Sequence, residues 1–364
     1  MKKHISFPSQ ELNFIRMKKH ISFPSIEQFR NIVANVNRQY NFVGLDEKGE
    51  AIYDQSLPKP TLTFKGTVKL HGTNAGVCYN VRGGLWAQSR ENIITPEQDN
   101  AGFAFFVESN KEVFETLVKM ISNRSNIDLN KTTISIYGEW CGGNIQKGVG
   151  ITNLPKSFFI FGVKITPHVI AFDLEAQKKY PAYWVDSTDL GNSEVKIYNI
   201  ADFKTFSMDI DFNMPQLKQN ELSEITIGVE TECPVAKAFG FTGIGEGVVW
   251  TTEYKGTVHR FKVKGEKHSA SKVRTLAAVD VDKLNSIKEF VDYAVTESRF
   301  NQALEKVFTN GEPIDVKKMG DVIRWVVNDV VKEEIDTMSA NKIEPKEVNK
   351  YISAKVREMF FKLA

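Results

Sequence analysis

The chain has 364 residues, of which 41% are hydrophobic and 25% charged, and 47 basic against 45 acidic side chains give a net charge of +2. This composition is typical of a globular protein with two or three domains, and no stretch of about 18 apolar residues predicts a membrane-spanning helix. Because the charges nearly balance, a nucleic-acid-binding face would have to be local rather than spread over the surface.

The three cysteines, Cys78, Cys141 and Cys233, lie far apart and lack the spacing of metal ligands. They therefore argue against a zinc site or a disulfide framework and favour a reducing cytosol. The apolar stretch near the N-terminus is also too short for a signal peptide.

A nine-residue duplication opens the chain, since residues 1–9 recur letter for letter as residues 17–25. An identity of this length is too good for an ancient structural repeat. We interpret residues 1–16 as an extension that arose from cloning or from the choice of start site, without fold or function, and Met17 as the native start.

The first predicted elements lead to one lysine. Ser25 is placed to N-cap a helix over residues 25–36, and an irregular stretch with two prolines follows. Residues 61–68 are rich in β-branched and aromatic residues and predict a strand that ends at Lys69, with Gly72 opening the turn beyond it. A lysine in this position can be held rigidly over a pocket, although a surface lysine before a hairpin shows the same pattern.

The following segments mix strands and helices. The expected elements are a hairpin of strands 75–79 and 85–87, a helix over 102–120, and strands over 132–137 and 157–164. Residues 165–240 give the weakest pattern, with short strands expected at 169–172 and 182–185. Strands then follow at 248–250 and 259–263. Since side chains alternate along a strand, Lys262 and Lys264 should project to one face and Val263 to the other.

From about residue 269 the composition predicts helix after helix. Three apolar stripes recur at helical spacing: Leu284, Ile287, Val291 and Ala294; Met319, Val322, Val326 and Val330; and Val348, Ile352, Val356, Met359 and Leu363. Pro345 suits the first turn of the last helix. The sequence thus predicts one domain over residues 17–267 and an all-helical domain over residues 268–364.

Several short motifs follow one another in a specific order. They are Lys69-Leu70-His71-Gly72-Thr73-Asn74, Arg90, Tyr137-Gly138-Glu139, Phe161, Glu246-Gly247, and Lys262 with Lys264. This order resembles the covalent nucleotidyltransferase superfamily of DNA ligases, RNA ligases and mRNA capping enzymes. The histidine after the lysine, Ser89-Arg90, the run from Gly143 to Gly148 and the helical C-terminus are most similar to the phage RNA ligase 2 family.

The resemblance implies an α+β fold: an ATP-grasp-like nucleotidyltransferase domain of antiparallel sheets with flanking helices, followed by the helical domain. It implies an ATP-dependent RNA ligase that uses Mg²⁺ or Mn²⁺ and joins 3′-hydroxyl to 5′-phosphate RNA ends. Lys69 would become a lysyl-AMP, AMP would pass to the RNA 5′-phosphate, and a 3′-hydroxyl would displace it. The implied partners are RNA ends, in nicked duplex RNA or an RNA/DNA hybrid, acted on by a cytoplasmic monomer (in the host, if phage-encoded).

Each motif has a chemical reason to serve this reaction. A lysine amine is a poor nucleophile at neutral pH, and the nearby cations Lys262 and Lys264, with a metal, would favour its neutral form. Glu246 is a hard oxygen ligand for that metal. The other implied roles are nucleotide contact by Leu70 and Asn74, phosphate binding by Arg90, ribose binding by Glu139, adenine stacking by Phe161, and a later-step role for His71.

Two departures from the family pattern keep alternatives open. Gly162 follows Phe161 where the family usually has aspartate, and Val68 precedes Lys69 where the family can carry glutamate. A DNA ligase, a capping-type enzyme, or a nucleic-acid-binding protein with a decayed adenylation site are the alternatives. Structurally, Arg90 could merely pair with Glu91 or Asp99. The helical domain is the candidate for RNA recognition.

Overall fold

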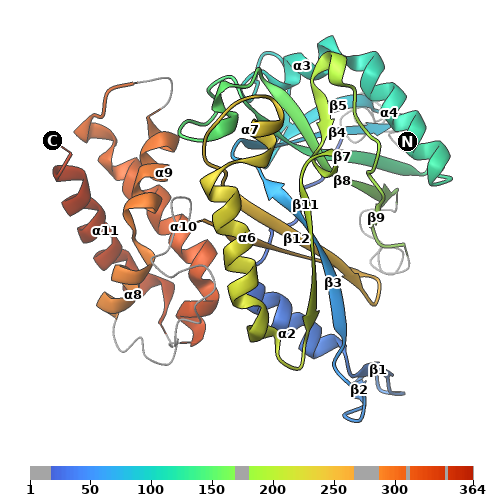
Figure 1. The fold of residues 1–364 in the computed structure, drawn as a ribbon, viewed down its shortest axis with the longest axis horizontal. Helices are drawn as coiled ribbons and strands as arrows, with labels where there is room; N and C mark the ends of the chain where they lie inside the picture. The colour runs from blue at the N-terminus through green and yellow to red at the C-terminus, as the bar shows by residue number, and fades with distance from the viewer. Residues whose placement is uncertain (1–17, 169–179, 266–286, 309–311, 341–342, 364) are drawn as a thin grey trace, which may run out of the picture. The chain divides into compact units, whose positions relative to one another are not determined.

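The computed structural model describes residues 18–168, 180–265, 287–308, 312–340 and 343–363. Its chain divides into two compact units, one of residues 1–213 with 231–262 and one of residues 214–230 with 263–364 (Figure 1). The predicted extension over residues 1–16 and the predicted boundary between residues 267 and 268 lie outside the described residues, so both stay predictions.

A four-stranded sheet carries the lysine. Its strands, in the order β11, β3, β12, β13, are Thr205–Asp211, Thr61–Lys69, Gly247–Tyr254 and Thr257–Lys264, and β3 pairs antiparallel with both β11 and β12. Alternate residues of β3, including Phe64 and Val68, are buried, while Lys65 is exposed. The helix α2 (Phe29–Gln39) packs against this sheet, with the Phe29 ring 5.0 Å from the ring of Phe261.

A second, seven-stranded sheet faces its own helices. Its order is β10-β8-β7-β4-β5-β6, with β9 also paired to β8, and these neighbours run antiparallel except for β10 with β8. The strands are β4 (Thr73–Asn80), β5 (Gly84–Ser89), β6 (Ile93–Ile94), β7 (Thr132–Cys141), β8 (Ser157–Pro167), β9 (Tyr183–Val185) and β10 (Ile197–Asn199). Helices α3 (Phe103–Ser109) and α4 (Lys111–Arg124) cover one face (Figure 1), and their core includes Phe103, Phe114, Ile136 and Phe158.

Two helix predictions need correction. The helix expected over residues 102–120 is two helices, because the backbone of Asn110 leaves the helical region with φ −119° and ψ 28°. The helix expected from Ser25 begins only at Phe29, with Gln28 as its N-cap. The residues before it are extended because the backbone of Glu27 pairs with Phe261 of β13.

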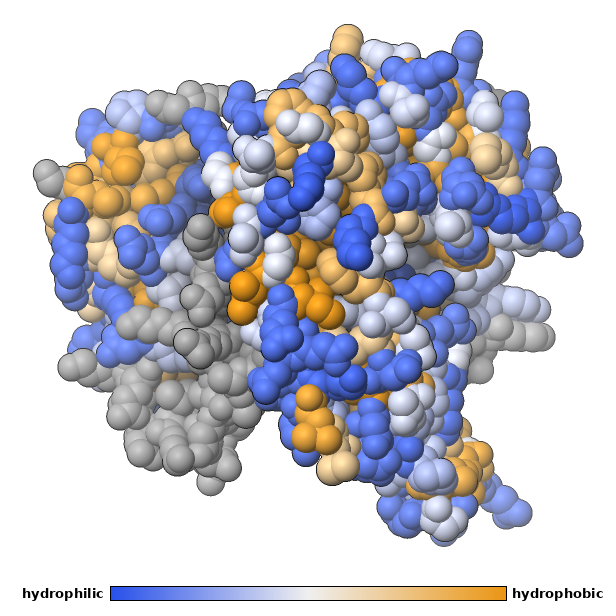
Figure 2. Space-filling model, viewed as in Figure 1, coloured by the Kyte–Doolittle hydropathy of each residue, from blue (hydrophilic) through white to orange (hydrophobic). Residues whose placement is uncertain are grey.

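The stretch after α2 is ordered where the sequence predicted an irregular segment. Strands β1 (Phe42–Leu45) and β2 (Ala51–Tyr53) form an antiparallel hairpin. Apolar side chains on both strands remain exposed, and Figure 2 shows them gathered near the lower end of the molecule. Because neither strand buries a face, the sequence lacks the alternation of apolar and polar residues that would predict these two strands.

The weakly patterned region from residue 165 to 240 contains short elements. The expected strand at residues 182–185 is confirmed as β9, and the one at 169–172 lies outside the described residues. The region also holds α7 (Pro234–Ala238) and the 3₁₀ helices η2 (Ser193–Val195), η3 (Ile200–Asp202) and η4 (Pro215–Lys218). A further 3₁₀ helix, η1 (Gly150–Asn153), begins at the end of the glycine-rich loop of residues 141–150.

The second unit is helical, as the sequence predicts. It contains α8 (Ile287–Ala294), α9 (Glu297–Val307), η6 (Val316–Lys318), α10 (Met319–Ala340) and α11 (Pro345–Phe361), and includes most of α6 (Gln219–Thr231). The stripe residues form its core, apart from Leu284, which is not described, and Leu363, which is 51% exposed beyond the end of α11. Buried Arg299 pairs with Asp329 at 2.8 Å. These sheets and helices confirm the predicted α+β class.

The structure also bears on the cysteines and on membrane-spanning helices. All three cysteines are buried free thiols, so no disulfide links them. Among the described residues, no helix is both long and apolar enough to cross a bilayer.

Candidate active site

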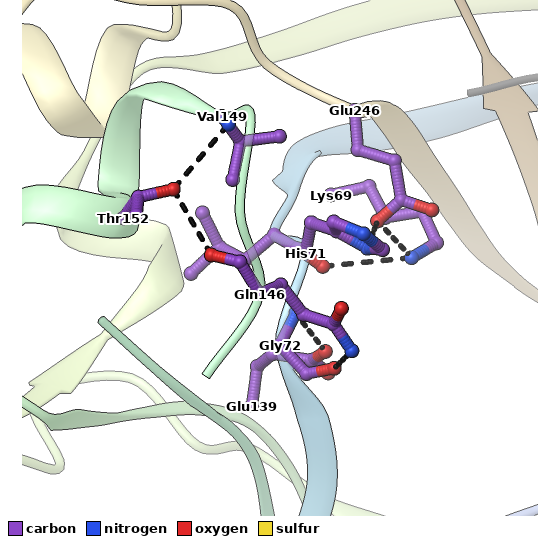
Figure 3. Close-up of polar contacts among 9 residues, drawn as sticks. Lys69, His71, Gly72, Glu139, Gln146, Val149, Thr152 and Glu246 are labelled. Atoms are coloured by element: carbon purple, nitrogen blue, oxygen red, sulfur yellow. Dashed lines mark hydrogen bonds and ion pairs between the residues drawn. The ribbon is translucent and has the colours of Figure 1, made fainter. Parts of the chain in front are cut away.

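Lys69 meets a carboxylate at the end of its strand. Because Lys69 pairs with Gly247 at the start of β12, the preceding residue, Glu246, is brought beside it. The Lys69 Nζ atom lies 2.6 Å from Glu246 Oε2, and the His71 Nδ1 atom lies 3.5 Å from the same oxygen (Figure 3). Glu246 is almost fully buried, so this contact is shielded from solvent. The structure therefore joins three predicted site residues around one carboxylate oxygen.

A second carboxylate holds the turn after the lysine. The Gly72 N–H donates a hydrogen bond to Glu139 Oε1 at 2.9 Å, and Glu139 pairs across from Asn74 of β4 (Figure 3). A Cβ atom at Gly72 would lie 2.5 Å from the carbonyl oxygen of Trp140, which explains why glycine is needed here. The requirement comes from the close approach of two backbones, since the φ angle of Gly72 is not in the left-handed region.

The glycine-rich loop supplies a contact that the sequence analysis did not identify. Gln146 Nε2 donates to the Gly72 carbonyl at 3.4 Å, and the Gln146 carbonyl accepts from Thr152 Oγ1 at 3.0 Å (Figure 3). The Thr152 hydroxyl in turn accepts from the Val149 N–H. The resemblance had included this loop, but it gave no role to the glutamine. Gln146 therefore holds the carbonyl of Gly72, whose N–H is held by Glu139.

Phe161 lies at an irregularity in β8. Tyr137 pairs with Gly162 and Gly138 pairs with Ile160, so Phe161 is the extra residue of a β-bulge. A bulge reorients the side chain of its extra residue relative to the regular alternation. The Phe161 ring remains partly exposed, and its centroid lies 4.9 Å from the ring of Phe23 in an edge-to-face arrangement.

The segment of residues 21–27 was missed by sequence reasoning and touches several predicted site residues. Phe23 packs on Phe161, the Ser25 hydroxyl accepts a hydrogen bond from Arg90 at 3.2 Å, and the Lys262 N–H donates to the Glu27 carbonyl at 3.1 Å. The segment is itself anchored, because the Ile21 carbonyl accepts from both Gln88 and Tyr137. No local sequence signal marks such an extended segment, since these contacts to site residues and anchors are all distant along the chain.

Arg90 follows β5 and borders a cavity. The cavity has a volume of about 500 Å³ and is lined by polar residues that include Thr73, Asn92, Asp99 and Asn100. The Arg90 guanidinium donates a hydrogen bond to the Ser25 hydroxyl. The alternative in which Arg90 merely pairs with Glu91 or Asp99 is therefore not what the structure shows. Asp99 instead accepts from the backbone N–H groups of Ala104 and Phe105 at the start of α3.

The lysine pair on β13 follows the expected alternation. Lys262 and Lys264 are both partly exposed, whereas Phe261 and Val263 are buried. Both lysines therefore project from the sheet face opposite its buried core.

The described residues contain no group of three or more His, Cys, Asp or Glu side chains placed to hold a metal ion. Mg²⁺ is commonly held by only one or two protein carboxylates, with water and substrate phosphates completing its shell. A single buried carboxylate, Glu246, fits that second pattern. The proposed metal site stays a prediction.

Burial affects the titration of Glu139. Desolvation raises the pKa of this carboxyl, while the Lys69 charge and the Gly72 N–H act in the opposite direction. A carboxyl whose pKa is raised on folding contributes stability below its unfolded pKa, about 4.3, and this contribution is lost as the pH rises through the folded pKa.

We therefore expect Glu139→Gln to raise the melting temperature at pH 8, by about 2–4 °C for each kcal/mol regained in a chain of this size. The gain should shrink towards pH 4, where the wild-type carboxyl is protonated. Thermal unfolding of both proteins across this range checks it. A gain that is equal at both ends, or a lower melting temperature at pH 8, would contradict the assignment.

The chain can now be compared with known proteins. Residues 63–264 match the family model described as RNA ligase. Solved structures of the Naegleria gruberi RNA ligase are also similar. The structure with PPi has 15% identity, a TM-score of 0.38 and coverage of 67% of this chain and 56% of that one. The corresponding values for a point mutant with ATP and Mn are 15%, 0.40, 68% and 56%.

This chain thus spans little more than half the length of the solved relatives, and a search of curated proteins found no match. The family match runs from the third residue of β3 to the end of β13, a range that carries each predicted site residue. It confirms, at the level of RNA ligases, the resemblance drawn from the motifs. The chain belongs to the RNA ligase family.

Proposed function

We propose that this protein is an ATP-dependent RNA ligase of the phage RNA ligase 2 type, which joins a 3′-hydroxyl to a 5′-phosphate, with nicks in duplex RNA as its substrate. The observation that supports this most is the contact between Lys69 and Glu246 at 2.6 Å, inside the segment that matches the family. It pairs a potential nucleophile with a potential metal ligand at the end of one strand.

The first step is the transfer of AMP to Lys69. After passing its proton to solvent, the Lys69 amine attacks the α-phosphorus of ATP, a P–N bond forms, and the bond to pyrophosphate breaks. An ammonium bound to a carboxylate has no free lone pair, so Glu246 must first release Lys69. A divalent metal, when bound, would neutralise phosphate charge and would be held by Glu246.

The remaining residues act on the nucleotide. In this proposal Glu139, which also holds Gly72, accepts hydrogen bonds from the ribose, and the partly exposed ring of Phe161 stacks on the adenine. Lys262 and Lys264 offset the triphosphate charge, and Arg90 binds a phosphate. Leu70 and Asn74 line the nucleotide next to Lys69.

Two transfers complete the reaction. An oxygen of the RNA 5′-phosphate attacks the phosphorus of lysyl-AMP and breaks the P–N bond, which gives an adenylylated RNA end. The 3′-hydroxyl of the other strand end then attacks the 5′-phosphate and displaces AMP. His71, which lies within 3.5 Å of Glu246, is assigned to these later steps.

The test combines nucleotide labelling with strand joining. The protein is incubated with α-labelled ATP or GTP and divalent metal, denatured and separated by electrophoresis, and then supplied with nicked RNA, nicked DNA or open single strands. We expect label from ATP only, and joining of nicked RNA. Label from GTP alone would indicate a capping-type enzyme. No label under any nucleotide or metal condition would favour a binding protein with a decayed site.

A further inference from the structure

The glycine after Phe161 makes room for a tryptophan. A Cβ atom at Gly162 would lie 3.3 Å from the indole of Trp184, closer than most such contacts. Trp184 belongs to β9, where it pairs with Lys164 of β8. The absence of an acidic side chain at position 162 is thus matched by a large aromatic ring packed over that position.

Two cations gather around this ring. The Arg260 guanidinium carbon lies 3.9 Å from the centroid of the Trp184 ring, and the Lys164 Nζ atom lies 5.8 Å from it. Arg260 also lies 5.4 Å from the ring of Phe23. Within the part of the chain that the structure describes, neither cation has a hydrogen bond or ion pair to an acidic side chain.

Their surroundings are unfavourable for charge. Burial lowers the pKa of Arg260 to about 10. Burial also lowers the pKa of Lys164, and the charge of Arg260 lowers it further. Cation–π contact with one indole offsets only part of the cost of burying two like charges, because each ion also loses hydration. An anion bound by both cations would offset this lost hydration and their mutual repulsion.

Along β8, Lys164 lies away from the proposed nucleotide site. Lys164 pairs with Ser135 of β7. Ser135 lies four residues along β7 from Glu139, so Lys164 and Glu139 are roughly 13 Å apart along the strand direction at the usual strand rise. Phe161 lies between them along β8. A nucleotide with its base on Phe161 and its phosphates at Lys69 would therefore point its phosphates away from Arg260.

We propose that Arg260 and Lys164, which both contact the Trp184 ring, bind a backbone phosphate of the substrate RNA. Arginine and lysine contacts to backbone phosphates supply most of the sequence-independent affinity of proteins for nucleic acids. The inference rests on the proposed function, because it assumes an RNA substrate. It adds a contact to RNA on the same unit that carries Lys69.

The experiment measures RNA binding directly. Arg260→Met and Lys164→Met each keep an unbranched apolar side chain against Trp184 and remove one charge. Lys204→Met is the matched control, since Lys204 is exposed and lies 5.7 Å from the ring of Phe206. Fluorescence anisotropy with a labelled nicked RNA duplex, over a series of salt concentrations, gives the affinity and its salt dependence.

Each of the two variants should bind more weakly, by about 5–10-fold at low salt, and its slope of log affinity against log salt should fall by about 0.9. The control should keep both values. Affinity within twofold of wild type with an unchanged slope would overturn the proposal. The contacts of Arg260 and Lys164 with Trp184 would then serve packing only. Loss of ATP labelling in proportion to RNA binding would also overturn it, by assigning the cations to the nucleotide. Failure of wild type to take label from ATP would instead refute the proposed function, while the RNA slopes could still be read.

Discussion

Replacing Lys69 with alanine should reduce covalent labelling of the protein from α-labelled ATP by at least about three orders of magnitude, since removal of a nucleophile leaves no route to the intermediate. Lys69 is the last residue of β3, and its pairing with Gly247 sets the amine beside Glu246. Electrophoresis after denaturation measures the label, and peptide mass mapping locates it.

Two further variants make this result specific. Lys69→Arg keeps a cation beside Glu246, but a guanidinium cannot be deprotonated in a protein, so labelling should be equally low. Lys65→Ala removes an exposed lysine on the same face of the same strand and should label like wild type. Persistent label in Lys69→Ala, or label that maps to another position, would refute the assignment.

Much of the fold could be predicted because its strands and helices have strong local patterns. The strand of residues 61–68 is rich in β-branched residues, and the helical stripes from Met319 and Val348 repeat every three or four residues. Where packing overrides local pattern, prediction failed. Asn110 divides one helical pattern into two helices, and Glu27 is held extended by a partner, Phe261, more than 200 residues away.

The site was predicted in its residues but not in its contacts. Motif order brought out Lys69, Glu139 and Glu246, and the structure joins these elements through Gly72 and one ion pair. The sequence analysis expected the cations Lys262 and Lys264 near Lys69. It did not predict that Glu246 Oε2 would lie 2.6 Å from the Lys69 Nζ atom. The bracing by Gln146 and the anchoring of Phe161 by Phe23 depend on tertiary proximity, which no spacing along the chain reports.

The ion pair of Lys69 with Glu246 makes opposite demands on the carboxylate. As the partner of Lys69 it holds the amine in an ion pair and delays attack on ATP. As a ligand for a metal bound to the phosphates it is needed for that attack. Glu246→Gln preserves the size of the side chain and an acceptor oxygen for Lys69, and it removes the negative charge that both roles use.

We expect the metal role to dominate, so that Glu246→Gln lowers the rate of labelling from ATP by about 100-fold or more and raises the Mg²⁺ concentration needed for half-maximal rate. A titration of labelling rate against Mg²⁺ and Mn²⁺ measures both effects. Glu253→Gln, an exposed carboxylate further along β12, is the control and should match wild type. Faster labelling in Glu246→Gln, with unchanged metal dependence, would mean that Glu246 only restrains Lys69. The metal would then have to be held by the nucleotide and by other residues.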